Sequence, residues 1–161
     1  MKKSSLIIIG INLIILLTYF NYSVFKKEEI LKHGQTIYLK LAPVDPRSLM
    51  QGDFMDLRYE LSNDIVVDSL SSRGYCVVKM NAEGIAQLVR FQKEKLPLKN
   101  EEHLIAYTRP DKFRLNIGAE SYFFQEGKAD HFAEAAFGGI KIDQHGNSLL
   151  IGLYDKKLNK L

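Results

Sequence analysis

The chain has 161 residues, of which 46% are hydrophobic and 25% charged, and its formal net charge is +3. This length suits one domain rather than two catalytic ones, and the composition excludes collagen-like, low-complexity and disordered classes. The single cysteine, Cys76, excludes a disulfide framework and a thiolate zinc cage, because both need a second sulfur from the same chain.

The first segment predicts a membrane-spanning helix. Lys2 and Lys3 precede residues 4–25, which carry no charge and are dominated by leucine and isoleucine. As a helix this segment would span about 33 Å, close to the ~30 Å hydrocarbon thickness of a bilayer. It is apolar all round, which argues against a buried core helix with one apolar stripe. We expect an uncleaved signal anchor, and a cleaved signal peptide, giving an exported soluble form, stays the alternative.

The flanking charges predict an orientation. A short basic N-terminus most often stays in the cytoplasm, which places the rest of the chain outside, although Lys26 and Lys27 argue for the opposite orientation. The expected organisation is an N-terminal anchor over residues 1–25, a juxtamembrane linker with the first strand over 26–35, and an extracytoplasmic domain over 36–161. Without Lys2 and Lys3, the chain has 20 basic and 19 acidic residues with no long run of one sign, so nucleic acid is not an expected partner.

Period-two alternation and turn residues predict a mostly β domain after the anchor. Ile37, Leu39 and Leu41 alternate with polar neighbours, and Ile30 with Leu31 could pair with this strand through a turn. Further strands are expected at 55–61, 75–80, 85–91, 104–108, 113–117, 140–143 and 149–154. The connections at 81–84, 109–112 and 144–147 contain Gly or Pro at turn positions and predict three hairpins.

One helix interrupts the strands. Between residues 127 and 137 the apolar side chains recur at helical spacing, and Gly138 with Gly139 would end the helix. The fold class expected is therefore mainly β (α+β): an N-terminal transmembrane helix, then an antiparallel sheet or partial barrel of about eight strands with one short amphipathic helix.

Reactive side chains do not form a recognisable catalytic or metal-binding pattern. The four histidines, His33, His103, His131 and His145, are isolated in sequence and predict solvated turn or surface residues. Cys76 alternates inward on its strand, which favours core packing over a nucleophilic role. We therefore expect no catalytic residue, no cofactor and no metal.

The densest polar cluster surrounds a turn that leads into the second strand. Two aspartates and two arginines could pair there, and Gly52 could supply a conformation closed to other residues. This corner is either an ion-paired structural element or a docking surface for a partner. Its residues are Asp45, Pro46, Arg47, Gly52, Asp53 and Arg58.

The run from Gly52 to Tyr59 is similar to the signature of the GDYXXLXY family. It contains Asp53, Leu57 and Arg58, with Phe54 where the name-giving tyrosine would stand. A second matching block contains Tyr122, Phe124, Gln125, Glu126 and Gly127, so the likeness covers most of residues 36–155. The resemblance implies a bacterial membrane-anchored or exported protein, often encoded beside a multi-pass membrane protein. It implies an accessory domain of the envelope that binds such a partner, and it supplies no catalytic residue.

Two other functions stay open. A proline followed by Gly-Asp entering a strand resembles signal-peptidase-like serine hydrolases, but Pro43 stands where the nucleophilic serine would be, and Ser48 lies beyond the proline. A related fold would therefore be an inactive one. The third possibility is an envelope sensor that binds a small ligand between the sheet and the helix at 129–137.

Overall fold

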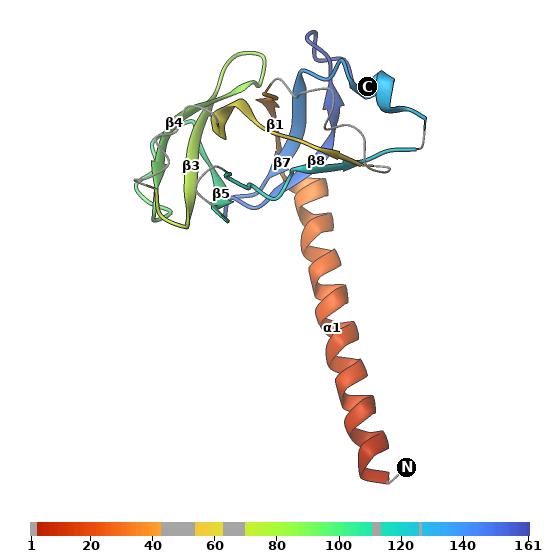
Figure 1. Cartoon of the computed structure of the whole chain (residues 1–161). Helices are drawn as coiled ribbons and strands as arrows, with labels where there is room; N and C mark the ends of the chain where they lie inside the picture. Colours follow the sequence, from red (N-terminus) through yellow and green to blue (C-terminus); the bar gives the residue numbers. More distant parts are fainter. Residues whose placement is uncertain (1–2, 43–53, 63–69, 111–113, 126) are drawn as a thin grey trace.

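A computed structural model describes residues 3–42, 54–62, 70–110, 114–125 and 127–161 of the chain. In these residues one long N-terminal helix carries a β domain at its C-terminal end, and the N-terminus lies at the far end of the helix (Figure 1). The described residues of the domain form three antiparallel sheets with eight strands in total. The predicted class, mainly β behind an apolar N-terminal helix, is confirmed.

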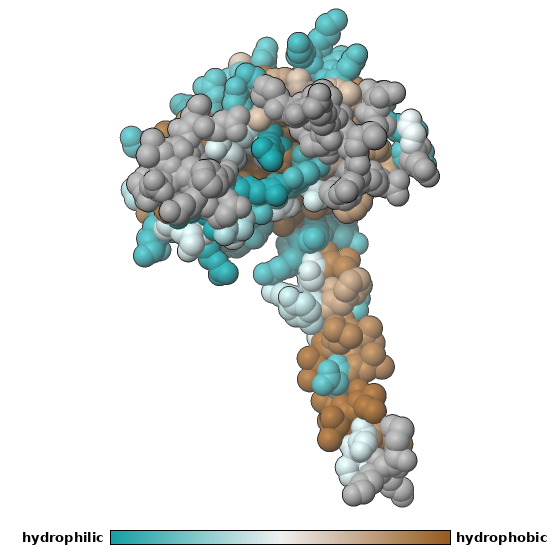
Figure 2. All heavy atoms as spheres, viewed as in Figure 1, coloured by the Kyte–Doolittle hydropathy of each residue, from teal (hydrophilic) through white to brown (hydrophobic). Residues whose placement is uncertain are grey.

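Helix α1 (Lys3–His33) is the longest element. None of its most apolar stretch is buried, and by length and composition it is a candidate membrane anchor or signal sequence. Figure 2 shows its hydrophobic surface giving way to hydrophilic residues where the helix reaches the domain. The predicted pairing of Ile30 and Leu31 with the first strand is wrong, because the helix continues through both. Ile30 instead packs into the domain, with 9% of its surface exposed.

The helix ends at Gly34, where the chain enters the first sheet. The Gly34 amide donates to the Ile30 carbonyl at 2.8 Å, which satisfies one of the open carbonyls of the last turn. A Cβ at this position would lie 2.4 Å from the Ile30 oxygen and 3.0 Å from the Ile142 oxygen. Because both contacts are backbone, only glycine allows α1 to approach the sheet this closely.

The first sheet has the order β1 (Gln35–Lys40), β7 (Phe137–Ile142), β8 (Ser148–Tyr154). Ile37 and Leu39 point into the core as their alternation predicts, and Ile37 lies opposite Ile140. The predicted β7–β8 hairpin is confirmed.

Helix α2 (Ala129–Phe132) is shorter than predicted, because Phe137 already belongs to strand β7. After a turn at residues 133–134, the chain forms hydrogen bonds to distant strands: the Leu41 amide donates to the Ala136 carbonyl at 2.9 Å, and the Ala136 amide to the Tyr154 carbonyl at 2.8 Å. Pairing with strands distant in sequence therefore outweighs the helical periodicity of residues 127–137.

The second three-stranded sheet has the order β4 (Ala86–Gln92), β3 (Arg73–Met80), β5 (Glu102–Thr108). Its predicted hairpin between β3 and β4 is confirmed: the Asn81 side chain accepts from the amides of Glu83 and Ile85, and Gly84 has a φ of 81°. In the part of the predicted hairpin at 104–117 that the structure describes, Thr108 and Asn116 form one bridge and exchange two hydrogen bonds of 2.8 Å.

The smallest sheet pairs β2 (Phe54–Asp56) with β6 (Ser121–Phe123). The strand predicted at 55–61 ends early, because the chain turns into the short 3-10 helix η2 (Glu60–Ser62). An isolated bridge from Leu41 to Tyr59 holds that turn against the first sheet. One hydrophobic core receives side chains from all three sheets, among them Ile37, Met55 and Ile105. Cys76 lies fully buried in it, and burial raises the pKa of its thiol to about 12.

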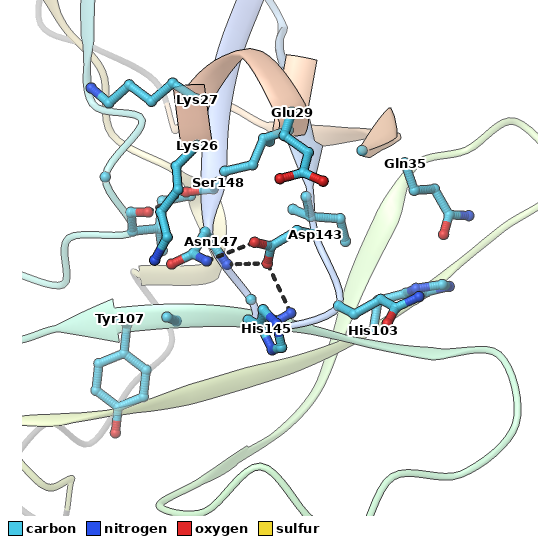
Figure 3. A pocket seen from close by; sticks show the side chains of 18 of the residues that line it. Lys26, Lys27, Glu29, Gln35, His103, Tyr107, Asp143, His145, Asn147 and Ser148 are labelled. Carbon is cyan, nitrogen blue, oxygen red and sulfur yellow. Dashed lines mark hydrogen bonds between the residues drawn. The ribbon is translucent and has the colours of Figure 1, made fainter. Parts of the chain in front are cut away.

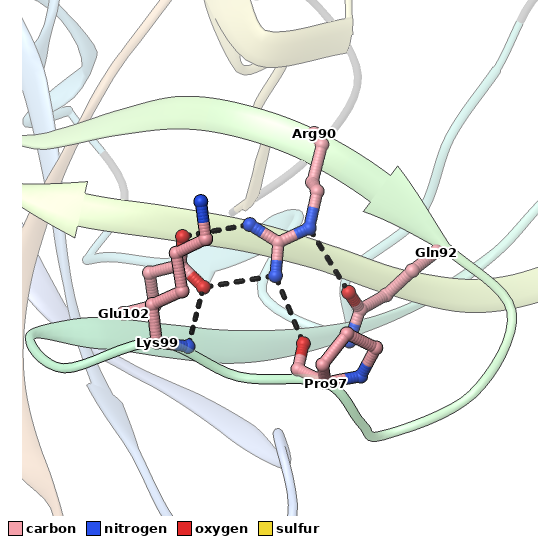
Figure 4. Close-up of polar contacts among 5 residues, drawn as sticks. All are labelled: Arg90, Gln92, Pro97, Lys99 and Glu102. Atoms are coloured by element: carbon pink, nitrogen blue, oxygen red, sulfur yellow. Dashed lines mark hydrogen bonds and ion pairs between the residues drawn. The ribbon is translucent and has the colours of Figure 1, made fainter.

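A polar clamp fixes the connection from β4 to β5 (Figure 4). The Arg90 guanidinium donates two hydrogen bonds to the Glu102 carboxylate, at 2.7 and 2.8 Å, and a third to the Pro97 carbonyl at 2.9 Å. The Lys99 amide donates to the same carboxylate at 2.8 Å. Because the Glu102 side chain is only 6% exposed, these bonds replace most of its hydration.

Substitution of Gly34 should destabilise the junction between α1 and the sheet. The added Cβ of Gly34→Ala meets backbone oxygens that cannot rotate away, so we expect a loss of about 1–3 kcal/mol in the free energy of unfolding, as for overpacked cores. Gly10→Ala is the matched control, because nothing lies within 4 Å of its Cβ. Thermal unfolding of the full-length protein in detergent measures both; equal midpoints would contradict the close approach.

The clamp predicts a pH-dependent stability. The Arg90 hydrogen bonds, followed by that from the Lys99 amide, lower the pKa of Glu102 from 4.5 to about 2. A lowered folded-state pKa stabilises the fold above the unfolded value, and this contribution is lost as the pH falls from about 4.5 to about 2. Glu102→Gln should therefore lower the unfolding temperature at neutral pH, with a difference that shrinks across that window. Glu101→Gln, at an exposed surface pair with Lys79, should change it less at every pH; a pH-independent Glu102 difference would contradict the assignment.

Candidate functional site

A groove of about 1000 Å³ lies where α1 meets the domain (Figure 3). One wall is formed by the last turns of α1, from Ser23 to His33. The other comes from β5 and from the turn between β7 and β8, residues 143–147. Two elements more than 100 residues apart in sequence therefore face each other across it.

The helical wall carries most of the groove's uncompensated charge. Lys26, Lys27 and Glu29 all line the groove. The Lys26 ammonium lies 5.1 Å from the centre of the Tyr22 ring, within the range of a cation–π contact. Among the described residues neither lysine takes part in an ion pair, whereas Lys32 on the same helix pairs with Glu28 at 3.2 Å. The groove therefore has two cationic groups available at one end.

The turn wall is rigid. The Asp143 carboxylate accepts from the amides of His145 and Asn147, both at 2.8 Å, and from the Asn147 side chain at 2.6 Å. Partial burial would raise the pKa of Asp143, but these hydrogen bonds outweigh that effect and hold it below its ordinary value. Gly146 closes the turn with a φ of 85°, and its carbonyl accepts from the Ala106 amide of β5 at 2.8 Å. The negative charge of Asp143 is thus stabilised by hydrogen bonds within its own turn.

Three of the four histidines line the groove: His33 at the end of α1, His103 on β5 and His145 in the turn. Figure 3 shows His145 and His103 on the side of the groove opposite Glu29. The positions of these three histidines in the sequence do not indicate that they line one groove, because no regular spacing relates them. Within the described parts of the chain no group of three or more His, Cys, Asp or Glu side chains could hold a metal ion. The site has the character of a polar binding surface with imidazole and ammonium donors.

The groove is not the pocket expected beside the helix at 129–137. None of its lining residues comes from that segment. Phe132 of α2 is instead buried, with the rings of Tyr122 and Phe124 each 5.2 Å from it. The described aromatic side chains at α2 therefore pack against one another, and a ligand pocket beside this helix stays a prediction.

The signature segment contributes mainly to the core where it is described. Leu57 and Tyr59 are almost fully buried, and Arg58 between them is exposed. The Tyr59 hydroxyl donates to the Ala119 carbonyl at 2.5 Å, and burial, then the charge of Glu120, raises the pKa of Tyr59. Asp45, Pro46, Arg47, Gly52 and Asp53 lie outside the described residues, as does Ser48, so the polar corner stays a prediction. Phe54 is described only by its backbone in β2.

The two sequence blocks meet in space. Met55 of the first block lies opposite Tyr122 of the second in the β2–β6 pair, and the Leu57 amide donates to the Glu120 carbonyl at 2.6 Å. Asp56 forms an ion pair with Arg114 beside this sheet. Gln125 and Gly127 are exposed, and Glu126 lies outside the described residues. The described part of the signature therefore holds two distant segments together.

Comparison with protein-family models identifies a family. The model of the GDYXXLXY protein family matches residues 16–153, which is most of the chain. The match includes the last part of α1, both sequence blocks and the strands from β1 to β8 except Tyr154, the final residue of β8. No curated protein and no solved structure matches significantly.

The hydroxyl of Tyr59 should be worth a measurable part of the fold's stability. Tyr59→Phe leaves the Ala119 carbonyl without its donor in the core, so we expect a loss of about 1–3 kcal/mol in the free energy of unfolding. Arg58→Gln, at the exposed neighbour, should change it by less than about 0.5 kcal/mol. Denaturant unfolding of the full-length protein in detergent tests both, and equal effects of the two substitutions would argue against the assigned hydrogen bond.

Proposed function

The chain belongs to the GDYXXLXY family, and we propose that it is a membrane-tethered accessory protein whose β domain binds a multi-pass membrane protein outside the cytoplasm. The observation that carries the proposal is α1. Its apolar stretch is long enough to cross a bilayer and is wholly exposed, and exposing this much apolar surface to water would be strongly unfavourable.

The junction at Gly34 gives the tether a mechanical consequence. Because α1 stays helical through His33 and Ile30 is buried in the domain, the domain is held at a fixed distance from the end of the apolar stretch. A flexible linker would let the domain diffuse around its anchor, whereas a packed helix presents one face to the membrane. Such a fixed face suits binding to a partner that lies in the same bilayer.

The second supporting observation is the nature of the described side chains. The signature residues Leu57 and Tyr59 serve the core, and the groove contains binding groups rather than a nucleophile with an oriented base. This arrangement supports an interaction domain; Ser48, on which the hydrolase alternative depends, lies outside the described residues. A small-ligand sensor is the second candidate, and it is favoured by the groove beside α1.

Co-purification tests the proposed partner. The full-length protein should remain in membranes after alkaline extraction and, after mild detergent solubilisation and cross-linking, should carry a multi-pass protein in fixed ratio. Arg58→Glu reverses an exposed charge in the predicted corner and should lower the recovered partner severalfold. Arg73→Glu, exposed at the start of β3, is the matched control. Recovery of the protein alone, or its appearance in the soluble fraction, would contradict the proposal.

A further inference from the structure

We infer that the groove between α1 and the β7–β8 turn binds the headgroup of an anionic phospholipid, with its phosphate at Lys26 and Lys27. The inference rests on the proposed membrane anchoring, and it adds a ligand to a site that the partner-binding role does not use. Its three supports are the depth of the groove relative to the bilayer, the charge at its membrane end and the hydrogen-bonding groups on its walls.

The position of the groove relative to the bilayer follows from the length of α1. Residues 4–25 span about 33 Å as a helix, which fills the ~30 Å hydrocarbon layer and places the next residues among the headgroups. Lys26 and Lys27 are those residues, and both line the groove. His33 stands about 10 Å farther along the helix axis. The groove therefore opens at the level of the lipid phosphates, whichever way the helix crosses the membrane.

The charge at this level favours an anion. Neither lysine has a carboxylate partner among the described residues, and the Asp143 carboxylate opposite them is occupied by three hydrogen bonds from its own turn. Glu29 is the remaining acidic side chain in the lining. Both lysines are exposed, and a phosphodiester at this end of the groove would compensate their ammonium groups.

The walls suit a polar headgroup more than an acyl chain. Figure 3 shows the Lys26 side chain extending toward Asn147, and Ser148, His145 and His103 line the same groove. These groups can donate to or accept from the hydroxyls of a headgroup such as glycerol. Since the β7–β8 turn is braced by Asp143, these groups need little reordering on binding. We therefore use phosphatidylglycerol, an anionic phospholipid with a glycerol headgroup, to test the site.

Native mass spectrometry of the full-length protein tests the site. The protein is reconstituted into bilayers of equal parts phosphatidylcholine and phosphatidylglycerol, extracted in mild detergent and scored for retained lipid. We expect preferential retention of phosphatidylglycerol, lowered at least about fivefold in the double variant Lys26→Gln, Lys27→Gln, since a lysine at an anionic surface is worth about that factor. His145→Ala, which changes only the opposite wall of the groove, should also lower the retention of phosphatidylglycerol.

The control is the double variant Lys156→Gln, Lys157→Gln. This pair follows Tyr154, at the opposite end of β8 from Ser148 in the groove, and both lysines are exposed. It should retain phosphatidylglycerol as the wild type does. Thermal unfolding checks that every variant is folded.

Four outcomes would overturn the inference. They are equal retention of the two lipids, equal loss in the control pair, full retention in His145→Ala, or a stable adduct with free glycerol phosphate without lipid. Full retention in His145→Ala would mean that the lysines attract anionic lipid as exposed surface charges without the groove. A stable adduct with glycerol phosphate would mean that the site binds a soluble phosphate ester. Alkaline extraction separates the two hypotheses: wild type released from membranes refutes the anchoring, whereas wild type that stays but keeps no phosphatidylglycerol refutes only the headgroup site.

Discussion

The close approach of α1 to the first sheet is the constraint on which the rest of the molecule depends. Gly34 allows it, because its missing side chain lets the helix end directly against the backbone of Ile142. Without this contact, the Ile30 side chain would not be buried in the domain, and the groove would not have the wall that α1 forms. The junction also converts an apolar helix into a rigid support, so the position of the domain follows from the position of the helix.

A second constraint joins the two sequence blocks of the family. Tyr59 fills the space left by Gly138, where a Cβ would lie 2.9 Å from its ring, and its hydroxyl reaches the Ala119 carbonyl. The β2–β6 pair adds backbone hydrogen bonds between the same regions. The buried Tyr59 ring packs directly against the backbone of Gly138. The role of this described part of the signature is therefore core packing.

The groove has properties that no single element supplies. Its cations belong to the helix that follows the apolar stretch, and its rigid polar wall belongs to a hairpin at the other end of the chain. The three histidines come from α1, β5 and the β7–β8 turn, and none is near another in sequence. Sequence reasoning treated each as an isolated residue, because spacing rules detect only sites built within one element.

The sequence by itself determined the elements whose signals are local. A long uncharged apolar segment specified most of α1, alternation specified β1, turn residues located the β3–β4 and β7–β8 hairpins, and the family signature was readable in Gly52–Tyr59. Only the tertiary structure decided where α1 ends, that the predicted helix at 127–137 gives way to β7, and which polar side chains share a groove. The physical reason is that these outcomes depend on hydrogen bonds and packing between segments far apart in the chain, and local periodicity contains no information about such partners.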